Sequence, residues 1–211
     1  SGYTFNVQPV GLPVTTAINV GETVSGAISV TGESDKHSFT IGSDSRLHFD
    51  SFTNNSGIVW TLTGPGGTAV SRRSFTGSDS FDNANPVLNL PAGDYTITVD
   101  GNGDVRGGYS FRLLDFALAV EITPGTAVSG SLSPATESDM YRFTATAGEQ
   151  YFFDVQTAVS NATWRLIDPY GSVIFSLQFV DDQDTLVIPR SGTYTLIIEG
   201  RWNAGSGTSG Y

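Results

Sequence analysis

A series of short motifs occurs twice in the chain, in the same order and 104 residues apart. Gly21–Gly26 (Gly-Glu-Thr-Val-Ser-Gly) returns as Gly125–Gly130 (Gly-Thr-Ala-Val-Ser-Gly), and Phe49-Asp50 returns as Phe153-Asp154. Other pairs are Glu33-Ser34-Asp35 with Glu137-Ser138-Asp139, Trp60-Thr61-Leu62 with Trp164-Arg165-Leu166 and, after a shortened loop, Gly93–Val99 with Gly192–Ile198. Because an internal repeat marks one structural unit that occurs more than once, the 211 residues are predicted to form two copies of one domain.

Apolar and polar residues alternate within each copy. His37, Phe39 and Ile41, for example, alternate with polar neighbours, which is the period of two that is typical of a β-strand with one buried face. Turn signals recur every 8 to 12 residues or so, and no window keeps the spacing of an amphipathic helix. We therefore predict an all-β fold of two tandem antiparallel β-sandwiches, at residues 1–116 and 117–211.

The motif Gly-Tyr-x-Phe marks the boundaries of the two copies. It occurs at Gly2–Phe5 and at Gly108–Phe111, and its first two residues recur as Gly210-Tyr211. The second copy thus stops where the first continues through a strand, and an open sheet edge is a template for another strand. We expect Tyr3–Val7 to begin the first copy as a permuted strand or to complete a second copy, in the same chain or by strand exchange with a neighbouring one.

Composition excludes several classes of function. Ten basic against twenty-one acidic side chains give a net charge of −11, so nucleic acid is not an expected partner, since phosphate binding needs a basic face. No apolar run approaches the roughly 18 residues of a membrane span, so no membrane insertion is expected. The chain has no cysteine, which removes thiol nucleophiles, disulfides and thiolate metal sites. Its start is not a signal peptide, and we read it as part of a longer protein.

Four motifs of the second copy together resemble a known family. They are Gly-x-x-Val-x-Gly (Gly125–Gly130), Asp-x-Tyr-x-Phe (Asp139–Phe143), Trp-x-Leu-x-Asp-Pro-x-Gly (Trp164–Gly171) and Gly-Thr-Tyr-Thr-Leu (Gly192–Leu196). In this order they resemble the bacterial pre-peptidase C-terminal (PPC) domain, which is related to collagen-binding modules of secreted proteases. The resemblance implies a jelly-roll-like sandwich that serves as a non-catalytic appendage or repeat. The first copy departs from the pattern at His37 and Gly64.

Calcium is the cofactor that this resemblance implies. Some relatives bind it through acidic residues near the first strands, which here correspond to Glu33 and Asp35 and to Glu137 and Asp139. Calcium takes six to eight oxygen ligands, and these four residues occupy the same loop in both copies. The alternative is that they cap strand ends by hydrogen bonds to the backbone. Both interpretations remain open from the sequence.

The residues do not predict catalysis. A Ser-His-Asp hydrolase needs a histidine as its base, but the only two histidines, His37 and His48, are replaced in the repeat by Tyr141 and Phe152. A position that accepts an aromatic ring is expected to be occupied for its shape. No spacing selects a pair of carboxylates for glycoside cleavage, and we predict that the chain is not an enzyme.

One loop is a candidate for ligand binding. Trp202 stands between Arg201 and Asn203, a combination that suits a glycan, although such a tryptophan can equally pack across a seam between domains. Further candidates for exposed aromatic rings, in predicted loops or at their margins, are Tyr170, Phe75, Phe81 and Phe179. We expect an extracellular spacer or adhesion repeat of a large secreted or surface bacterial protein. The alternative is a module that binds carbohydrate or matrix protein and targets an attached enzyme.

Overall fold

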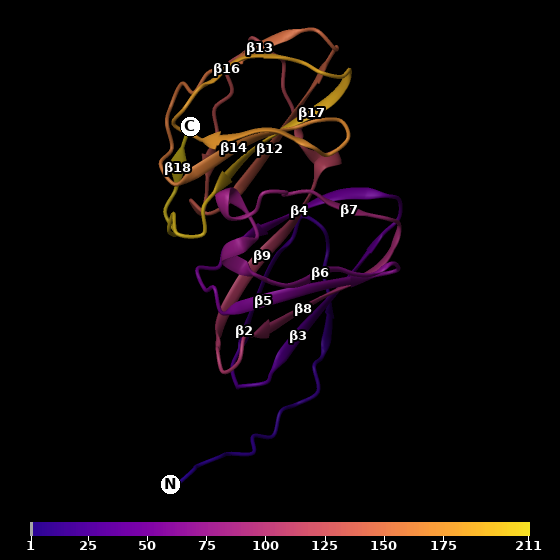
Figure 1. The fold of residues 1–211 in the computed structure, drawn as a ribbon, viewed down its shortest axis with the longest axis vertical. Helices are drawn as coiled ribbons and strands as arrows, with labels where there is room; N and C mark the ends of the chain where they lie inside the picture. The colour runs from indigo at the N-terminus through magenta and orange to yellow at the C-terminus, as the bar shows by residue number, and fades with distance from the viewer. Residues whose placement is uncertain (1) are drawn as a thin grey trace.

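The computed structural model describes residues 2–211 and contains two β-sandwiches stacked along the long axis of the molecule (Figure 1). The first sandwich has a five-stranded sheet in the order β1-β3-β8-β5-β6 and a four-stranded sheet in the order β2-β9-β4-β7. Its strands are β1 (Thr15–Ala17), β2 (Thr23–Ile28), β3 (Ser34–Ile41), β4 (Ser45–Ser51), β5 (Ile58–Gly64), β6 (Gly67–Ser74), β7 (Leu88–Leu90), β8 (Gly93–Gly101) and β9 (Gly107–Asp115). The prediction of an all-β fold with two sandwiches is confirmed.

The second sandwich repeats the first, but its second sheet is divided. One sheet has five strands in the order β10-β12-β17-β14-β15, and two separate two-stranded sheets, β11-β18 and β13-β16, stand where the first copy has four strands. These strands are β10 (Val120–Glu121), β11 (Ser131–Leu132), β12 (Ser138–Ala145), β13 (Gln150–Phe153), β14 (Ala162–Ile167), β15 (Val173–Gln178), β16 (Gln183–Val187), β17 (Gly192–Gly200) and β18 (Ser209–Gly210).

Each five-stranded sheet has one parallel pair at its edge, where the sequence predicted antiparallel pairing. Thr15–Ala17 runs parallel to β3, and Val120–Glu121 runs parallel to β12. Between β1 and β3 the chain passes through β2 in the other sheet, so the two strands enter their sheet in the same direction. A crossover of this kind, and not a hairpin, is the connection that parallel strands require.

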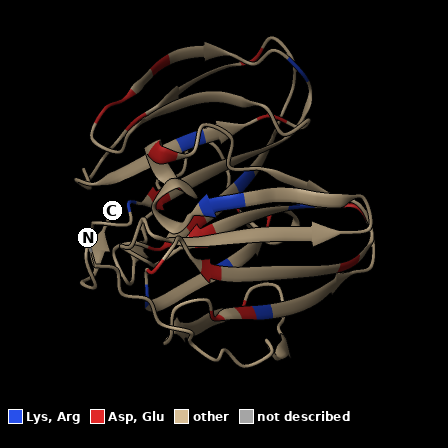
Figure 2. Cartoon of the chain, turned by 60° about the horizontal axis from the view of Figure 1, so that its bottom comes forward, with Lys and Arg blue, Asp and Glu red and all other residues tan. Residues whose placement is uncertain are grey.

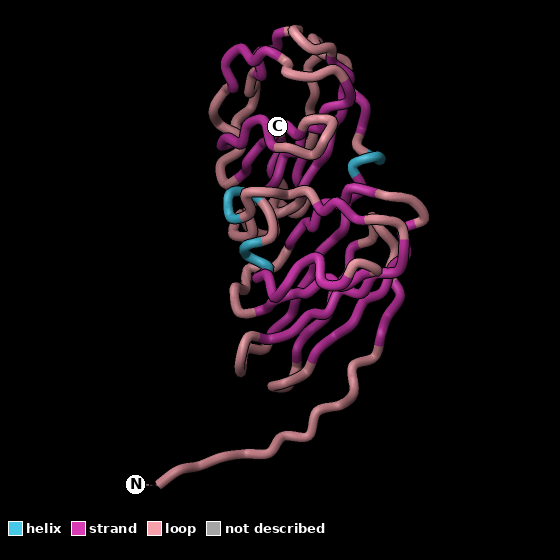
Figure 3. Tube along the Cα trace, turned by 45° about the vertical axis from the view of Figure 1, so that its right-hand side comes forward, coloured by secondary structure: helices cyan, strands magenta, loops and turns pink. Residues whose placement is uncertain are grey.

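The helical segments are three single turns of 3₁₀-helix, η1 (Phe75–Gly77), η2 (Ser80–Asp82) and η3 (Phe116–Leu118), drawn in cyan in Figure 3. The first two lie in the connection from β6 to β7, and η3 links the two sandwiches. Within residues 2–211, no helix is both long and apolar enough to cross a membrane.

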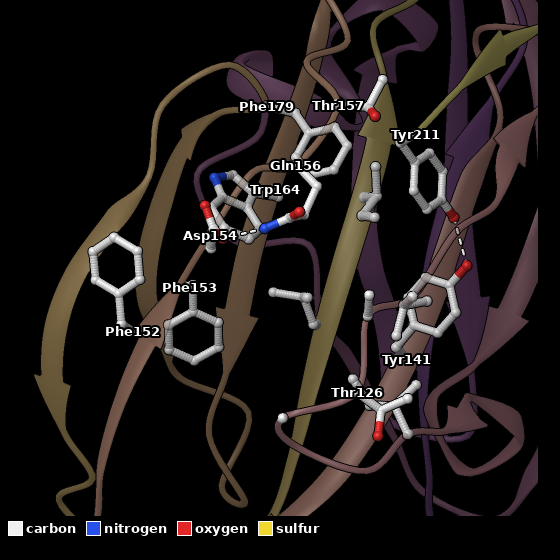
Figure 4. Close-up of a pocket in the computed structure, with 16 residues that line it drawn as sticks. Thr126, Tyr141, Phe152, Phe153, Asp154, Gln156, Thr157, Trp164, Phe179 and Tyr211 are labelled. Atoms are coloured by element: carbon white, nitrogen blue, oxygen red, sulfur yellow. Dashed lines mark hydrogen bonds between the residues drawn. The ribbon is translucent and has the colours of Figure 1, made fainter.

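The core of each sandwich is aromatic. In the first, Phe49 lies between Trp60 and Phe111, with ring centroids 3.9 and 4.9 Å away, and Trp164 occupies the position of Trp60 in the second. Both tryptophans are buried, as the alternation predicts. The prediction that loop aromatic rings are exposed is confirmed for Tyr170 and Phe81. It is wrong for Phe75 and Phe179, because both rings belong to the cores, and Figure 4 shows Phe179 beside Trp164.

Residues 2–14 contain no strand, and the first part of this segment extends away from the first sandwich (Figure 1, Figure 3). Tyr3–Val7 therefore pairs with neither sandwich of its own chain, and both intramolecular versions of that prediction are wrong. Pairing with a neighbouring chain stays a prediction.

Candidate functional site at the seam between the copies

The predicted metal residues Glu33 and Asp35 contact protein donors. Glu33 Oε2 accepts hydrogen bonds from the backbone N–H groups of Ser29 and Val30, at 2.5 and 2.9 Å. The Tyr109 hydroxyl donates to Asp35 Oδ2 at 2.7 Å. Burial, and then the Asp35 carboxylate, raise the pKa of Tyr109. The loop is thus tied to β9 by a neutral phenol that donates to a carboxylate.

The second copy repeats this arrangement with Glu137 and Asp139. Glu137 Oε2 accepts from Ser133 N at 2.8 Å, and the Tyr211 hydroxyl donates to Asp139 Oδ2 at 2.6 Å. The motif glycine makes room for the ring, since a Cβ added to Gly130 would lie 2.5 Å from the Tyr211 hydroxyl oxygen. In the first copy Gly26 has the same relation to Tyr109, at 2.3 Å. Several motif residues therefore serve one tyrosine contact in each copy.

These contacts bear on the calcium hypothesis. Calcium needs six to eight oxygen ligands, whereas each loop offers two carboxylates that already accept hydrogen bonds from the protein. In the part of the chain that the structure describes, no three His, Asp or Glu side chains gather in a way that could hold a metal ion. The donor set does not fit calcium and favours loop capping, and calcium binding stays a prediction for experiment.

An apolar cluster fills the seam between the two sandwiches. Val87 and Phe116 of the first copy pack with Met140, Ile167 and Ile197 of the second, and all five side chains are buried. In β14 both faces of the strand are buried, because one face covers its own core and the other meets the first sandwich. The centre of the seam is therefore an apolar cluster to which both sandwiches contribute buried side chains.

Charged groups surround this cluster, and Arg112 holds the first set. Its guanidinium contacts Asp50 Oδ2 at 2.9 Å, Glu137 Oε1 at 3.0 Å and the Ser138 carbonyl at 3.1 Å. The Ser138 N–H also donates to Asp50 Oδ2, at 3.3 Å. Arg112 belongs to β9 and Asp50 belongs to β4. Through these two side chains, the second sheet of the first copy contacts the start of β12.

A second set centres on Arg165, which projects from β14 into the seam. Its Nε donates to Glu199 Oε2 at 2.5 Å, while its two terminal nitrogens donate to the carbonyls of Ser80 and Asn83 in the first copy. The side chains of Arg165 and Glu199 are 1% and 0% exposed. Nearby, the hydroxyls of Ser80 and Thr163 are 2.6 Å apart. The η2 turn of the first sandwich is therefore held by the second.

Burial raises the pKa values of two carboxyl groups in this region. Desolvation raises the pKa of Asp50 to about 7, although Arg112 opposes the shift. Burial, followed by the nearby charges of Asp50 and Glu199, raises the pKa of Asp79 well above its usual range. Protonation of these two carboxyl groups is consequently linked to the stability of the folded chain.

His48 also lies in the seam, beside a serine and a carboxylate. Its Nε2 is 3.4 Å from Ser138 Oγ and 3.6 Å from Glu199 Oε1, while its Nδ1 faces the Pro86 carbonyl. A nucleophilic triad places the serine and the acid on opposite ring nitrogens, but here both lie on the same one. All three side chains are buried, and burial lowers the pKa of His48. The arrangement is therefore not that of a triad, and His48 lies beside polar groups of both copies.

The predicted ligand loop contributes to the same seam. Arg201 donates to both oxygens of Asp82 at 2.9 and 3.1 Å, and the Trp202 indole N–H donates to Asp82 Oδ2 at 2.9 Å. Partial burial disfavours ionisation of Asp82, but the hydrogen bonds from Arg201 and Trp202 outweigh it and lower its pKa. Asn203 is exposed and takes no part in these bonds. The structure favours packing of Trp202 across the seam between the domains over its exposure for glycan binding.

The residues that form the seam were not predicted, although the sequence carries a signal for them. Arg165 stands where the first copy has Thr61, and His48 stands where the second has Phe152. Departures from the repeat thus mark positions at which the two copies face different surroundings. Figure 2 shows acidic and basic residues on both sandwiches, and the sequence has twenty-one acidic against ten basic side chains.

Comparisons with known proteins add little to this geometry. No protein-family model matches the chain, and no curated protein matches it. One similar solved structure is the CUB1-EGF-CUB2 domain of human MASP-1/3, at 9% identity and a TM-score of 0.32, covering 92% of this chain and 100% of that one. Another is a cupin 2 conserved barrel domain protein from Leptotrichia buccalis, at 14% identity and a TM-score of 0.19, covering 92% and 88%. These likenesses assign no family, and the resemblance to PPC domains stays a prediction.

Proposed function

We propose that the chain is a non-catalytic pair of extracellular modules that acts as a rigid spacer in a larger secreted or surface protein. The observation that carries this proposal is the seam, which combines a buried apolar cluster with buried charged contacts. Domains joined by a linker move relative to one another unless their interface is large and apolar. A fixed angle between the two copies is the property that a spacer needs. The acidic surface, with a net charge of −11, suits a soluble repeat that resists nonspecific association.

Distance measurements between the two sandwiches test the rigidity. The chain has no cysteine, so Thr68→Cys and Ser176→Cys, at exposed strand positions, place one spin label on each sandwich. We expect a single narrow distance distribution by pulsed electron paramagnetic resonance. Phe116→Asp, which puts a charge into the apolar cluster, should broaden the distribution, whereas Leu118→Asp in the same turn, 76% exposed, should not. A broad distribution in the unaltered chain would refute a rigid spacer.

A second candidate is a module that binds carbohydrate or matrix protein for an attached enzyme. The half-exposed Trp202, with the Arg201 guanidinium 5.3 Å from its ring centroid, is the feature that supports it. Asp82 already accepts from both side chains, which leaves fewer donors for a sugar. A glycan and collagen array tests this function: a saturable ligand that Trp202→Ala abolishes would support it, and no ligand would support the spacer.

A further inference from the structure

The turn between β8 and β9 carries the only asparagine–glycine pair of the sequence, Asn102-Gly103. Asn102 follows directly after β8, and both residues of the pair are exposed. In such a pair the backbone nitrogen of the glycine can close a five-membered ring on the side-chain amide of the asparagine, and the glycine has no Cβ to hinder this approach. The pair is therefore a candidate for a reaction of the chain with itself.

The two reacting groups are not engaged by the rest of the fold. Within residues 2–211, no hydrogen bond involves the Asn102 side chain or the Gly103 N–H. The ring closes after a rotation about the Cα–C bond of Asn102, which brings the Gly103 nitrogen toward the side-chain carbon. This rotation breaks the hydrogen bond from the Val105 N–H to the Asn102 carbonyl, which at 3.4 Å is long and weak. The turn therefore offers little resistance to ring closure.

Nearby groups that could react in the same way are held by the first sandwich. The carboxylate of Asp100, which also precedes a glycine, accepts a hydrogen bond from Arg72 at 2.9 Å, and the backbone of Asp100 pairs with both β3 and β5. The side-chain oxygen of Asn55 accepts from the Gly57 N–H at 3.0 Å, and a serine follows Asn55 in the chain. The fold should therefore direct the reaction to Asn102.

We propose that Asn102-Gly103 is a self-modifying site, at which the asparagine is deamidated and isomerised. The Gly103 nitrogen attacks Cγ of Asn102 and forms a C–N bond, while the bond from Cγ to Nδ2 breaks. Nδ2 leaves as ammonia and takes with it the proton that the Gly103 nitrogen gives up. Water then opens the resulting succinimide at one of its two carbonyls. One opening gives aspartate, and the other gives isoaspartate, in which the main chain runs through the former side-chain carbon.

The isoaspartate product would disturb the packing of this turn. The Asn102 N–H donates to the Gly57 carbonyl at 2.8 Å, and Val105 packs against the core of the first sandwich. The chain segments approach closely here, since a Cβ added to Gly57 would lie 2.7 Å from Val105 Cγ1, and one added to Gly101 would lie 2.0 Å from the Val105 carbonyl oxygen. Isoaspartate adds one carbon to the main chain between Asn102 and Val105. The longer chain would displace Val105 from the core.

The site lies away from the seam. β9 begins after this turn and ends beside η3, which links the two sandwiches, so the turn lies at the opposite end of the first sandwich (Figure 1). Conversion of Asn102 adds one negative charge at this end to a chain whose net charge is −11. It leaves the contacts between the two copies in place. The modification therefore acts on the first sandwich and not on the angle at which the copies dock.

Peptide mapping of the intact chain by mass spectrometry tests the proposal. One sample is incubated folded at mildly alkaline pH, which deprotonates more of the attacking nitrogen, and a second sample is incubated in urea at the same pH. We expect the Asn102 peptide to gain the mass that replacement of NH2 by OH brings, at comparable rates in both samples, and to give two products of equal mass. Asn55 should react only in urea. The proposal would be overturned if Asn102 reacted in urea alone, or if another asparagine reacted first in the folded chain.

Three variants test the site and its consequence. Asn102→Gln keeps an amide but needs a larger ring, so it should remove the main acidic species that ion-exchange chromatography separates after incubation. Asn203→Gln, at another exposed asparagine, is the matched control and should leave that species unchanged. Freshly purified Asn102→Asp has the added charge without the longer main chain, so the isoaspartate fraction should melt at a lower temperature than this variant. Equal melting temperatures would count against the displacement of Val105.

Discussion

Replacing Arg165 by methionine separates the buried charges of the seam. Methionine is unbranched and adapts its shape to the space that an arginine stem leaves. The change removes the cation that contacts Glu199 and the donors that reach the carbonyls of Ser80 and Asn83. Because the Glu199 side chain is fully buried, its charge would be left without its strongest partner. We therefore expect Arg165→Met to destabilise the folded chain strongly.

The size of the effect follows from the burial. Removing one partner of a buried ion pair costs about 3–5 kcal/mol, mainly because the other charge is left uncompensated. For a chain of this size, each 1 kcal/mol lowers the melting temperature by about 2–4 °C. The expected fall in melting temperature is therefore about 6–20 °C.

Calorimetry and urea unfolding at neutral pH measure this loss, with two control variants. Arg72 pairs with Asp100 at 2.9 Å on the surface, where the side chains are 50% and 32% exposed, so Arg72→Met should cost at most about 1 kcal/mol. Arg165→Met combined with Glu199→Met replaces the whole pair by apolar side chains and should recover much of the loss.

The reasoning about buried charge would be refuted if Arg165→Met cost no more than Arg72→Met. It would also be refuted if the double variant were as unstable as the single one, since the penalty would then come from packing. A calorimetric trace that splits into two transitions in Arg165→Met alone would show, in addition, that the pair couples unfolding of the two sandwiches.

Three further predictions concern the seam and the loop carboxylates. Between about pH 4 and about pH 7, the folded chain retains a proton on Asp50 that the unfolded chain has released. The contribution of Asp50 to the free energy of unfolding therefore falls as the pH rises over this interval. Urea titrations should show Asp50→Asn gaining stability relative to the native chain over that interval, and parallel curves would contradict the raised pKa of Asp50. Loop capping predicts the same melting temperature in millimolar calcium and in a chelator, whereas a calcium site predicts a rise with calcium concentration. Asp82→Ala and Trp202→Ala should show a coupling energy of about 0.5–1 kcal/mol in a double-mutant cycle, and additive effects would mean that their hydrogen bond contributes nothing.

The sandwiches themselves could be predicted because their determinants are local and occur twice. Alternation fixes which side chains of a strand share a face, and the repeat shows which alternations matter. Trp60 and Trp164 were placed correctly in the cores on this basis. The parallel edge strands were missed, since a run of three residues such as Thr15–Ala17 carries no signal for its direction.

The seam could not be predicted from either copy alone, because it depends on how two folded units meet. Arg165 lies on a strand face that would be exposed in an isolated sandwich, and only the first copy buries it. Phe75 and Phe179 were misjudged for another reason: both were assigned to loops, although the register of 104 makes them counterparts. Two phenylalanines at one repeat position indicate a shared core, whatever the backbone around them.

Buried charges give a spacer something that apolar packing alone does not. The apolar cluster at the seam stabilises contact between the copies, but the hydrophobic effect is non-directional and does not by itself select one docking angle. Arg112 and Arg165 each contact carboxylates or carbonyls of both copies. A shifted register would leave these charges buried and unpaired, at a cost of several kcal/mol each. We infer that the apolar cluster provides the affinity between the copies and that the arginines select the single angle at which they dock.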